Sequence, residues 1–440
     1  MASNAPLVLF RILLGALMLL ESWGAIATGW VHSAFVEPRL TFPIADFVWL
    51  RVLSGEWMYA YFGVMGLAAI GVTLGWRYRM SSVSLAVLWT GAYLAQTTHY
   101  NNHYYLAALI AWGMALVPAA DRASLDVCAG RRPLRHDADP WIARAFRLQV
   151  LIVFSYAAVA KLYPGWLNGD YLRVNLGSKG GRWPLGSLVV QSWFQSFTIW
   201  AALIFDALVI PALWWRRTRV LGFLGLLGFN LFNSVVFRIG IFPYMVLALT
   251  VFFFSEARME RALVRLQGKS GIRDAPRSKF ERAARRAPWV APALAAFFFL
   301  QLALPLRHHF FRGDVAWTEE GHRMSWRMML RTKSAQLALV VEDAASGAVR
   351  PVNQTEFLTA RQQMLVASQP AMLFRFAQDL AAALREPGMQ EPGVYARYSA
   401  CSLNGSDPSP LYDPEVDLTR VRWNRFSRNE WVLDQGRSAH

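Results

Sequence analysis

Long apolar runs separated by short polar connections cover residues 7–306 of the chain. A membrane-spanning α-helix needs about 20 mostly apolar residues, because lipid offers no hydrogen bonds to the backbone. The runs predict nine spans, at residues 7–29, 57–75, 81–98, 103–119, 147–165, 193–214, 220–237, 240–254 and 289–306. The pattern therefore predicts a mainly α-helical, polytopic membrane domain over residues 1–307.

The first apolar run has one feature of a secretory signal peptide, since Ala25-Ile26-Ala27 resembles a cleavage site. It lacks a basic amino-terminal segment, and Arg11 and Glu21 lie inside it. We therefore expect this run to be retained as a membrane span.

The pattern changes after residue 307, where polar residues become common. Residues 335–341 and 348–352 have the composition of strands and flank a turn at 345–347. Residues 369–386 predict an amphipathic helix that ends at Glu386-Pro387-Gly388. We expect residues 308–440 to form a small α+β domain.

The composition supports a membrane protein, with 55% hydrophobic residues, 14% aromatic residues and a mean hydropathy of +0.25. The net charge of +16 comes from basic residues in the connections between apolar runs. That distribution is typical of membrane topology and not of a basic groove, so we expect the lipid bilayer as a partner and no nucleic acid.

The basic residues also predict the orientation of the spans. With the amino terminus inside, the internal connections carry 21 Lys or Arg residues and the external connections carry six. The positive-inside rule favours this orientation over its reverse. Nine crossings then place residues 308–440 outside. If the protein is bacterial, its spans lie in the inner or plasma membrane and this region lies in the periplasm; in a eukaryotic endomembrane the region lies in the lumen. Cys128 and Cys401 would lie on opposite sides and could not pair.

A lysine interrupts the fifth predicted span. In a continuous helix Lys161 lies about 21 Å beyond Arg147, short of the far side of a hydrocarbon core about 30 Å thick. An ionisable group at that depth is a functional candidate, and burial there disfavours a charged amine. The alternative is a lysine whose flexible stem lifts its ammonium to the headgroups. Trp166 is expected near the far interface.

Two histidines four residues apart, His99 and His103, mark the connection between the third and fourth spans. No acidic residue or third imidazole lies nearby in the sequence, so we expect no metal site. One interpretation is that Asn102 and His103 orient an oxygen of a bound ring at a helix start. The other is helix capping by Asn101 or Asn102 with interfacial aromatic anchors.

Three further groups of residues have both a functional and a structural interpretation. Asn230 and Asn233 lie inside an apolar span, where asparagine often bonds neighbouring helices. Trp423 and Arg428 in the tail could bind a carboxylate-bearing peptide, or they could simply lie on a solvated strand edge. The third group comprises Ser325, Trp326, Met328 and Met329. Its residues could form an adaptable apolar wall for a bound ring or peptide, or the core of a domain.

The order and wording of these motifs closely resemble the vitamin K-dependent γ-glutamyl carboxylases and their bacterial relatives with an HTTM domain. The resemblance covers nearly the whole chain, from Phe10-Arg11 to Trp431-Val432. The shared motifs include Trp57-Met58-Tyr59, Asn101-Asn102-His103, Lys161-Leu162 with Trp166, Asn233-Ser234, Ser325-Trp326 with Met328-Met329, and Asp413-Pro414.

The resemblance implies roles for individual residues. Lys161 matches the catalytic base that takes a proton from reduced vitamin K. His103, with Asn102 beside it, matches the residues that hold the quinol and assist its ionisation, so the resemblance implies that Lys161 and His103 are catalytic. We place His99, Asn230 and Asn233 with the cofactor-binding residues. The expected peptide-binding residues are Ser325, Trp326, Met328, Met329, Trp423 and Arg428.

The family reaction explains why such residues are needed. A glutamate γ-C–H is too weak an acid for any side chain to deprotonate near neutral pH. In the family a deprotonated quinol reacts with O₂, and the product removes the γ-proton while collapsing to an epoxide. The carbanion then captures CO₂, which makes the enzyme a carbon–carbon lyase in reverse. The implied cofactor is reduced vitamin K of the menaquinol or phylloquinol type, in a dry pocket without a metal.

Three hypotheses follow for the function. The first is an enzyme that couples quinol epoxidation to carboxylation of peptidyl glutamate. The second is a quinol epoxidase without carboxylation, because Asn230 stands where the animal enzymes carry a histidine and the carboxy terminus is shorter. The third is a transporter or structural bundle. The sequence argues against it, because it shows no repeated halves or paired broken helices of the kind that many transporters have.

Overall fold

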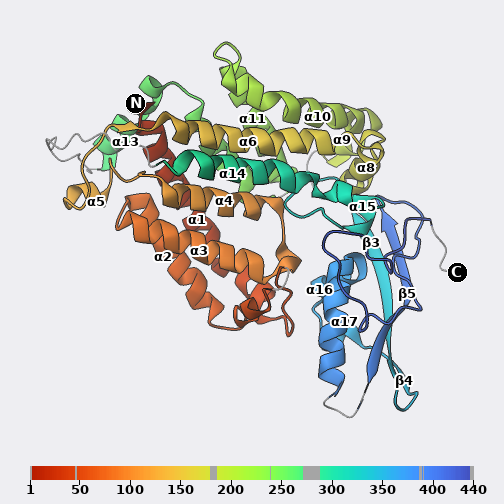
Figure 1. Cartoon of the computed structure of the whole chain (residues 1–440). Helices are drawn as coiled ribbons and strands as arrows, with labels where there is room; N and C mark the ends of the chain where they lie inside the picture. The colour runs from red at the N-terminus through yellow and green to blue at the C-terminus, as the bar shows by residue number, and fades with distance from the viewer. Residues whose placement is uncertain are drawn as a thin grey trace. The chain divides into compact units, whose positions relative to one another are not determined.

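The computed structural model describes residues 2–44, 47–178, 186–237, 239–270, 288–385, 389 and 391–436 (Figure 1). The chain forms two compact units, which are described separately. The helical unit comprises Met1–Glu37, Pro43–Ser155 and Phe205–Leu300. The mixed unit comprises Pro38–Phe42, Tyr156–Ile204 and Gln301–His440.

The helical unit is built from apolar helices joined by short connections (Figure 1). A two-residue strand, β1 (Ala2–Ser3), at the start of the chain pairs with β2 (Asp137–Ala138), just before α6. Gly75, which follows α2, has a φ of 62°, a left-handed conformation that glycine adopts without strain. The helices are α1 (Ala5–Ala27), α2 (Met58–Leu74), α3 (Tyr78–Ala95), α4 (Asn102–Leu116), α5 (Leu125–Cys128), α11 (Arg219–Val236), α12 (Phe242–Leu249), α13 (Glu256–Ser270), and parts of α6 (Pro140–Ala160), α10 (Ser192–Trp214) and α14 (Val290–Ala303).

Each of the nine predicted apolar runs carries a helix, but their lengths differ. Among the described residues, five helices are long and apolar enough to cross a membrane, at Ala5–Ala27, Pro140–Ala160, Ser192–Trp214, Arg219–Val236 and Val290–Phe310, and a bent pair would make a sixth. The bent pair contains the eighth predicted span, because the helix that begins at Phe242 turns by 115° before Glu256. The mainly helical membrane class is confirmed, whereas nine crossings and the orientation stay predictions.

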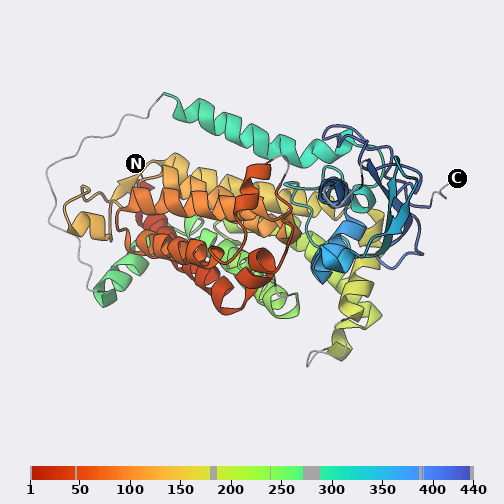
Figure 2. The same ribbon diagram turned by 90° about the horizontal axis from the view of Figure 1, so that it is seen from below.

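Close helix contacts depend on small residues. A Cβ on Gly15 of α1 would lie 2.4 Å from the Thr73 hydroxyl of α2, so these helices cross at a distance that only glycine permits. The indole of Trp23 likewise fills the space beside Gly66. By contrast α14 lies at the margin of the helices in Figure 2, and only 11% of the Val290–Phe310 span is buried.

Arg11 fixes the end of the helical unit that carries the basic connections. Its guanidinium is fully buried and donates to the carbonyl oxygens of Ala119, Arg122 and Ala123, at 3.1, 3.2 and 2.5 Å. A further hydrogen bond of 3.4 Å reaches the Thr73 carbonyl on α2. One side chain therefore joins α1, α2 and the segment that follows α4.

The mixed unit contains an antiparallel sheet in the order β4-β3-β5. β3 (Lys333–Asp343) pairs along its whole length with β5 (Pro392–Leu403) and at one end with β4 (Val349–Pro351). The predicted strands at 335–341 and 348–352 are confirmed, and β5 is an addition. The unit's helices are α7 (Pro164–Leu167), α8 (Asp170–Gly177), α9 (Gly186–Val189), α15 (Val315–Thr318), α16 (Ala360–Ser368), α17 (Pro370–Arg385) and part of α10.

The predicted amphipathic helix at 369–386 is α17, which packs its apolar face on the sheet. Leu373, Phe376 and Leu380 on α17 share a core with Val341 of β3 and Val394 of β5. This core confirms a small α+β region at the carboxy terminus. The predicted stop at Glu386-Pro387-Gly388 lies outside the described residues.

The Arg11→Met variant tests the role of the buried guanidinium. It leaves four carbonyl groups without their donor, so we expect the free energy of unfolding to fall by about 3 kcal/mol. The measurement is the midpoint of thermal unfolding in detergent. Arg131→Met is the control, because that side chain is 47% exposed. Equal midpoints for the two variants would contradict this role.

Candidate active site

Lys161 lies just outside the helix in which it was predicted. α6 ends at Ala160, and Pro164 begins α7 after Tyr163 in an extended conformation, φ −122° and ψ 153°. Proline disfavours the helical conformation in the residue before it, which explains why α6 does not continue to residue 165. Lys161 is nevertheless only 5% exposed. The prediction of a buried lysine is correct, and the prediction of a continuous helix to 165 is wrong.

The amine of Lys161 is held by the end of α6 and by an indole. Its Nζ donates to the Ala157 carbonyl at 3.3 Å and lies 5.3 Å from the ring centroid of Trp166. Trp166 on α7 is 3% exposed, and its Nε1 has no hydrogen-bond partner among the described residues. A buried N–H without an acceptor marks a place where a bound molecule can accept a hydrogen bond.

A chain of side-chain contacts connects the Trp166 indole to the Ser325–Leu330 segment. Trp166 stacks on Tyr171 of α8 with centroids 5.7 Å apart. The Tyr171 hydroxyl then contacts the Met329 sulfur at 3.9 Å. The described residues of the mixed unit thus connect Lys161 to one of the predicted peptide-binding residues through two aromatic rings.

A tyrosine and an asparagine fix the end of that segment. The Tyr163 hydroxyl donates to the Leu330 carbonyl, and Asn404 Nδ2 lies 3.2 Å from the same hydroxyl. Asn404 Oδ1 accepts from the Thr332 N–H at 2.8 Å. Neither residue was among the sequence candidates. The signal that existed was Tyr163 two residues after Lys161, whereas nothing in the sequence links Asn404 to it.

The backbone before Leu330 is strained. Seven described non-glycine residues have a positive φ, and four of them lie between 319 and 329: Glu319 (63°), Met324 (59°), Trp326 (57°) and Met329 (56°). Each such residue costs about 1–3 kcal/mol unless its surroundings compensate, and such residues concentrate at functional sites. Ser325 and Trp326 are buried, so Arg327, Met328 and Met329 form the accessible edge of the segment.

A buried ion cluster compensates for this strain. Arg331 forms two hydrogen bonds to the Glu319 carboxylate, and Lys333 Nζ and His322 Nδ1 lie 3.4 and 3.2 Å from it. Although burial alone would raise it, the cations of Arg331 and Lys333 hold the pKa of the Glu319 carboxyl well below its usual range. Burial and the nearby Arg331 lower the pKa of His322 to about 3, so its imidazole is neutral at pH 7.

The two tail candidates are already engaged. The ring of Trp423 lies 5.9 Å from Phe374 and 6.2 Å from Trp431, in the core of the mixed unit. Arg428 pairs with Asp434 at 3.0 Å. The tail is joined to the strained segment through the neighbouring residue, since Asn429 Nδ2 donates to Glu320 at 2.6 Å.

In the helical unit, Asn101 caps α4, with its Oδ1 accepting from the Tyr104 N–H at 2.7 Å. Asn102 is buried, and its Oδ1 accepts from the Tyr100 hydroxyl at 3.1 Å. The His103 ring lies 4.5 Å from the Phe242 ring of α12, and the main chain at Ile239 is its hydrogen-bond partner. The capping interpretation is confirmed for Asn101, whereas a role of Asn102 and His103 in orienting a ring oxygen stays a prediction.

Asn230 and Asn233 lie on the buried face of α11. Asn230 is 1% exposed, and its Nδ2 donates to the Leu226 carbonyl at 2.8 Å. Its Oδ1 has no hydrogen-bond partner among the described residues. An amide with one satisfied and one unsatisfied end does not act as interhelical glue, which argues for a bound donor at this position.

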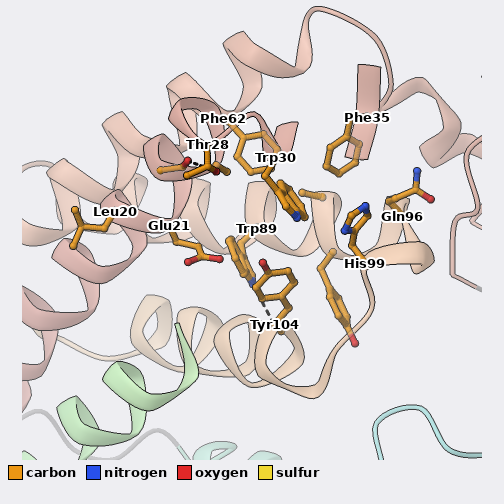
Figure 3. A pocket seen from close by; sticks show the side chains of 14 residues that line it. Leu20, Glu21, Thr28, Trp30, Phe35, Phe62, Trp89, Gln96, His99 and Tyr104 are labelled. Carbon is orange, nitrogen blue, oxygen red and sulfur yellow. Dashed lines mark hydrogen bonds between the residues drawn. The ribbon is translucent and has the colours of Figure 1, made fainter. Parts of the chain in front are cut away.

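His99 lines a separate cavity of about 260 Å³ in the helical unit, shown in Figure 3. Its ring packs edge to face on Trp30, with centroids 5.1 Å apart. Glu21, on α1, lines the same cavity, and the hydroxyl of Tyr104 donates to its carboxylate. Glu21 was not a sequence candidate, although an acidic residue inside an apolar span was signal enough.

Metal binding finds no support in the part of the chain that the structure describes. It contains no group of three His, Cys, Asp or Glu residues that could hold an ion. His99 and His103 have different surroundings, the Trp30 cavity and the Phe242 ring. The described residues offer a buried amine and an unpaired indole N–H in the mixed unit, and an unpaired buried amide oxygen at Asn230 in the helical unit.

Two family models match the chain, one over the helical part and one over the carboxy-terminal part. The HTTM domain matches residues 1–257, more than half of the chain, so the chain belongs to the HTTM domain family. Residues 286–438 match the lumenal domain of vitamin K-dependent gamma-carboxylase. The two matches confirm the resemblance to the carboxylase family. No solved structure matches the chain.

The low pKa of His322 predicts a pH dependence of stability. Between about pH 6.5 and pH 3 the unfolded chain binds a proton that the folded chain does not. The free energy of unfolding of the mixed unit should therefore fall as the pH falls, by up to about 1.4 kcal/mol per pH unit. The measurement is amide hydrogen exchange in β3 of the full chain at pH 7, 6 and 5.

His322→Gln removes this titration and should flatten the dependence. His309→Gln, at an exposed position, should leave it unchanged. A dependence as steep in His322→Gln as in the wild type would show that other groups cause it.

Proposed function

We propose that this protein is a vitamin K-dependent γ-glutamyl carboxylase-like enzyme, which couples epoxidation of a reduced vitamin K-type quinol by O₂ to carboxylation of peptidyl glutamate with CO₂. The observation that carries the proposal is the buried amine of Lys161 on the Trp166 ring. The family match of the mixed region to a vitamin K-dependent carboxylase domain supports it independently.

Lys161 is the proposed base that takes the first proton from a quinol hydroxyl. Its amine is shielded from water yet stays next to an indole face, so the ammonium that forms is stabilised by a cation–π contact. A lysine on an exposed turn would instead be fully hydrated and charged. The end of α6 at Ala160 supports this role, because it leaves Lys161 in a turn whose direction Pro164 and Trp166 determine.

The buried groups of the helical unit fit a quinol. Asn230 Oδ1 is a buried acceptor that a quinol hydroxyl could satisfy, and Asn233 lies on the same helix face. His103 and Asn102 are the further residues proposed to hold the ring and its oxygens. His99, which lines a separate cavity, is proposed to support this group without contacting the ring. When bound, reduced vitamin K supplies, together with O₂, the strong base that the glutamate γ-carbon requires. Exclusion of water by the surrounding apolar side chains protects that base.

The strained segment is the proposed wall for the glutamyl peptide. Met328 and Met329 present flexible thioethers at its accessible edge, which adapt to different neighbours of the glutamate. Ser325 and Trp326 support that edge from inside. Trp423 and Arg428 are proposed to bind the peptide more weakly, since both already have partners.

A quinol epoxidase without carboxylation is the second candidate. The observation that favours it is Asn230, where the animal enzymes carry a histidine, because an amide cannot accept a proton as an imidazole does. The orientation with the amino terminus inside belongs to the proposal, as does the division at residue 307 between a membrane catalytic domain and a periplasmic or lumenal domain.

Lys161→Ala tests the proposed base. We expect the rate of epoxide formation from reduced vitamin K in nanodiscs to fall by about 10²–10⁴-fold, the usual contribution of a positioned base. Arg173→Ala, whose side chain is 67% exposed in the same unit, is the control and should keep the wild-type rate. Epoxide formed by Lys161→Ala at the wild-type rate would exclude Lys161 as the base.

Asn230→His distinguishes the two candidate functions. If the amide limits the coupling, the histidine variant should incorporate more labelled CO₂ into a glutamyl peptide for each epoxide formed. Asn168→His, at an exposed position, is the matched control. An unchanged ratio in Asn230→His would show that this position does not control carboxylation.

A further inference from the structure

The cavity beside Glu21 differs from the sites described above in its chemistry. It is lined by the last turns of α1 and α3, the start of α4 and the segment after α1, all within the helical unit. Its volume is about 260 Å³, slightly below the roughly 300–1,000 Å³ of typical ligand pockets. A headgroup-sized ligand fits such a space, and a drug-sized one does not.

Half of the fourteen lining residues carry an aromatic ring, and most of these rings are labelled in Figure 3. Trp30 lies at its centre, with its ring centroid 5.9 Å from Phe62 and 6.2 Å from Tyr104. Trp89 lies 5.1 Å from Tyr104 and donates from Nε1 to the Tyr104 carbonyl at 3.1 Å. These contacts fix the rings, so the cavity is preformed.

Glu21 is the one acidic side chain in this lining, and Figure 3 shows it pointing toward Trp89 and Tyr104. In the described part of the chain it forms a hydrogen bond with Tyr104 and no ion pair. A carboxyl group partly removed from water either stays neutral or is paired with a cation. No lysine or arginine lines this cavity, and His99 is its only other ionisable group besides tyrosines, so a cationic ligand is the partner that would keep Glu21 ionised.

The cavity opens along the side of α1. Leu20, which lines it, is 70% exposed on a helix long and apolar enough to span a membrane. Such a surface faces lipid, so an amphiphile can present its headgroup to Glu21 while its chains stay in the bilayer. Thr28 at the end of α1 is exposed and marks the polar end of the opening.

We propose that this cavity binds the alkylammonium headgroup of a zwitterionic lipid. An ammonium satisfies the carboxylate by charge and the rings by cation–π attraction, which aromatic cages use for amine ligands. A neutral quinol ring would fill the space but leave Glu21 without a counter-ion. An anionic headgroup would be repelled. The site is separate from the residues assigned to the carboxylation reaction, apart from His99.

The test titrates the purified full-length protein in maltoside detergent with phosphatidylethanolamine and with phosphatidylglycerol of the same acyl chains. Native mass spectrometry counts the bound lipid. We expect at least tenfold tighter binding of phosphatidylethanolamine, and loss of that difference in Glu21→Gln. Glu37→Gln removes an exposed carboxylate of the same unit and should keep the preference.

Further measurements in the same experiment show whether the bound amine comes from a lipid or from solution, and which results would overturn the proposal. Free ethanolamine that binds as tightly as the lipid would support an alkylammonium site that takes a soluble amine. Equal binding of the two lipids by the wild-type protein would overturn the proposal without any variant. So would a preference that survives in Glu21→Gln, or displacement of the amine lipid by a vitamin K quinone.

Discussion

The burial of one amine constrains the rest of the candidate active site. A lysine that is 5% exposed needs a substitute for water, and Lys161 finds it in the Ala157 carbonyl and the face of Trp166. Placing that indole requires α6 to stop at Ala160 and α7 to begin at Pro164. The short helices α7 and α8 then bring Trp166 and Tyr171 together, and Tyr171 reaches Met329. The end of α6, the burial of Lys161 and the contact of Tyr171 with Met329 are thus consequences of one local geometry.

The two units divide the chemistry between them. The mixed unit carries the amine and a strained segment, which the ion cluster around Glu319 stabilises. The helical unit carries His103, Asn102 and the unsatisfied Asn230 amide, in surroundings that are otherwise apolar. Arg11 stabilises the opposite, basic end of the helical unit by binding four carbonyl groups. Polar groups therefore serve structure at the basic end, whereas the Asn230 Oδ1 has no partner among the described residues.

Much of this could be predicted from the sequence, because apolar runs and turn residues report directly on local structure. The runs located the five described helices that are long and apolar enough to span a membrane, and the resemblance identified the family, whereas α13 (Glu256–Ser270) was missed because its sequence is polar. The exact end of α6 was missed because hydropathy does not register the effect of Pro164 on the preceding residue. Strand β5 was missed because its partner, β3, lies far away in the sequence.

The candidate site shows the same division. Lys161 and Asn230 stood out as polar residues in apolar runs, and both are buried. Tyr171, Asn404 and the Glu319 cluster could not be found, since their importance comes from contacts across long stretches of chain. Trp423 and Arg428 suggested a peptide site by composition, but their neighbours in the fold engage them otherwise. Lys161 was identified because an ionisable side chain inside an apolar span is a functional candidate. The same reasoning applied to Glu21 would have identified that residue too.

The central claim is that a shielded lysine begins an oxygen-dependent reaction on a lipid-soluble ring and that this reaction drives carboxylation. The most direct measurement gives wild-type protein in nanodiscs reduced vitamin K, O₂, labelled CO₂ and a glutamyl peptide, and quantifies both products in one sample. The account predicts vitamin K epoxide together with label in the peptide. Absence of epoxide from folded protein under these conditions would contradict it.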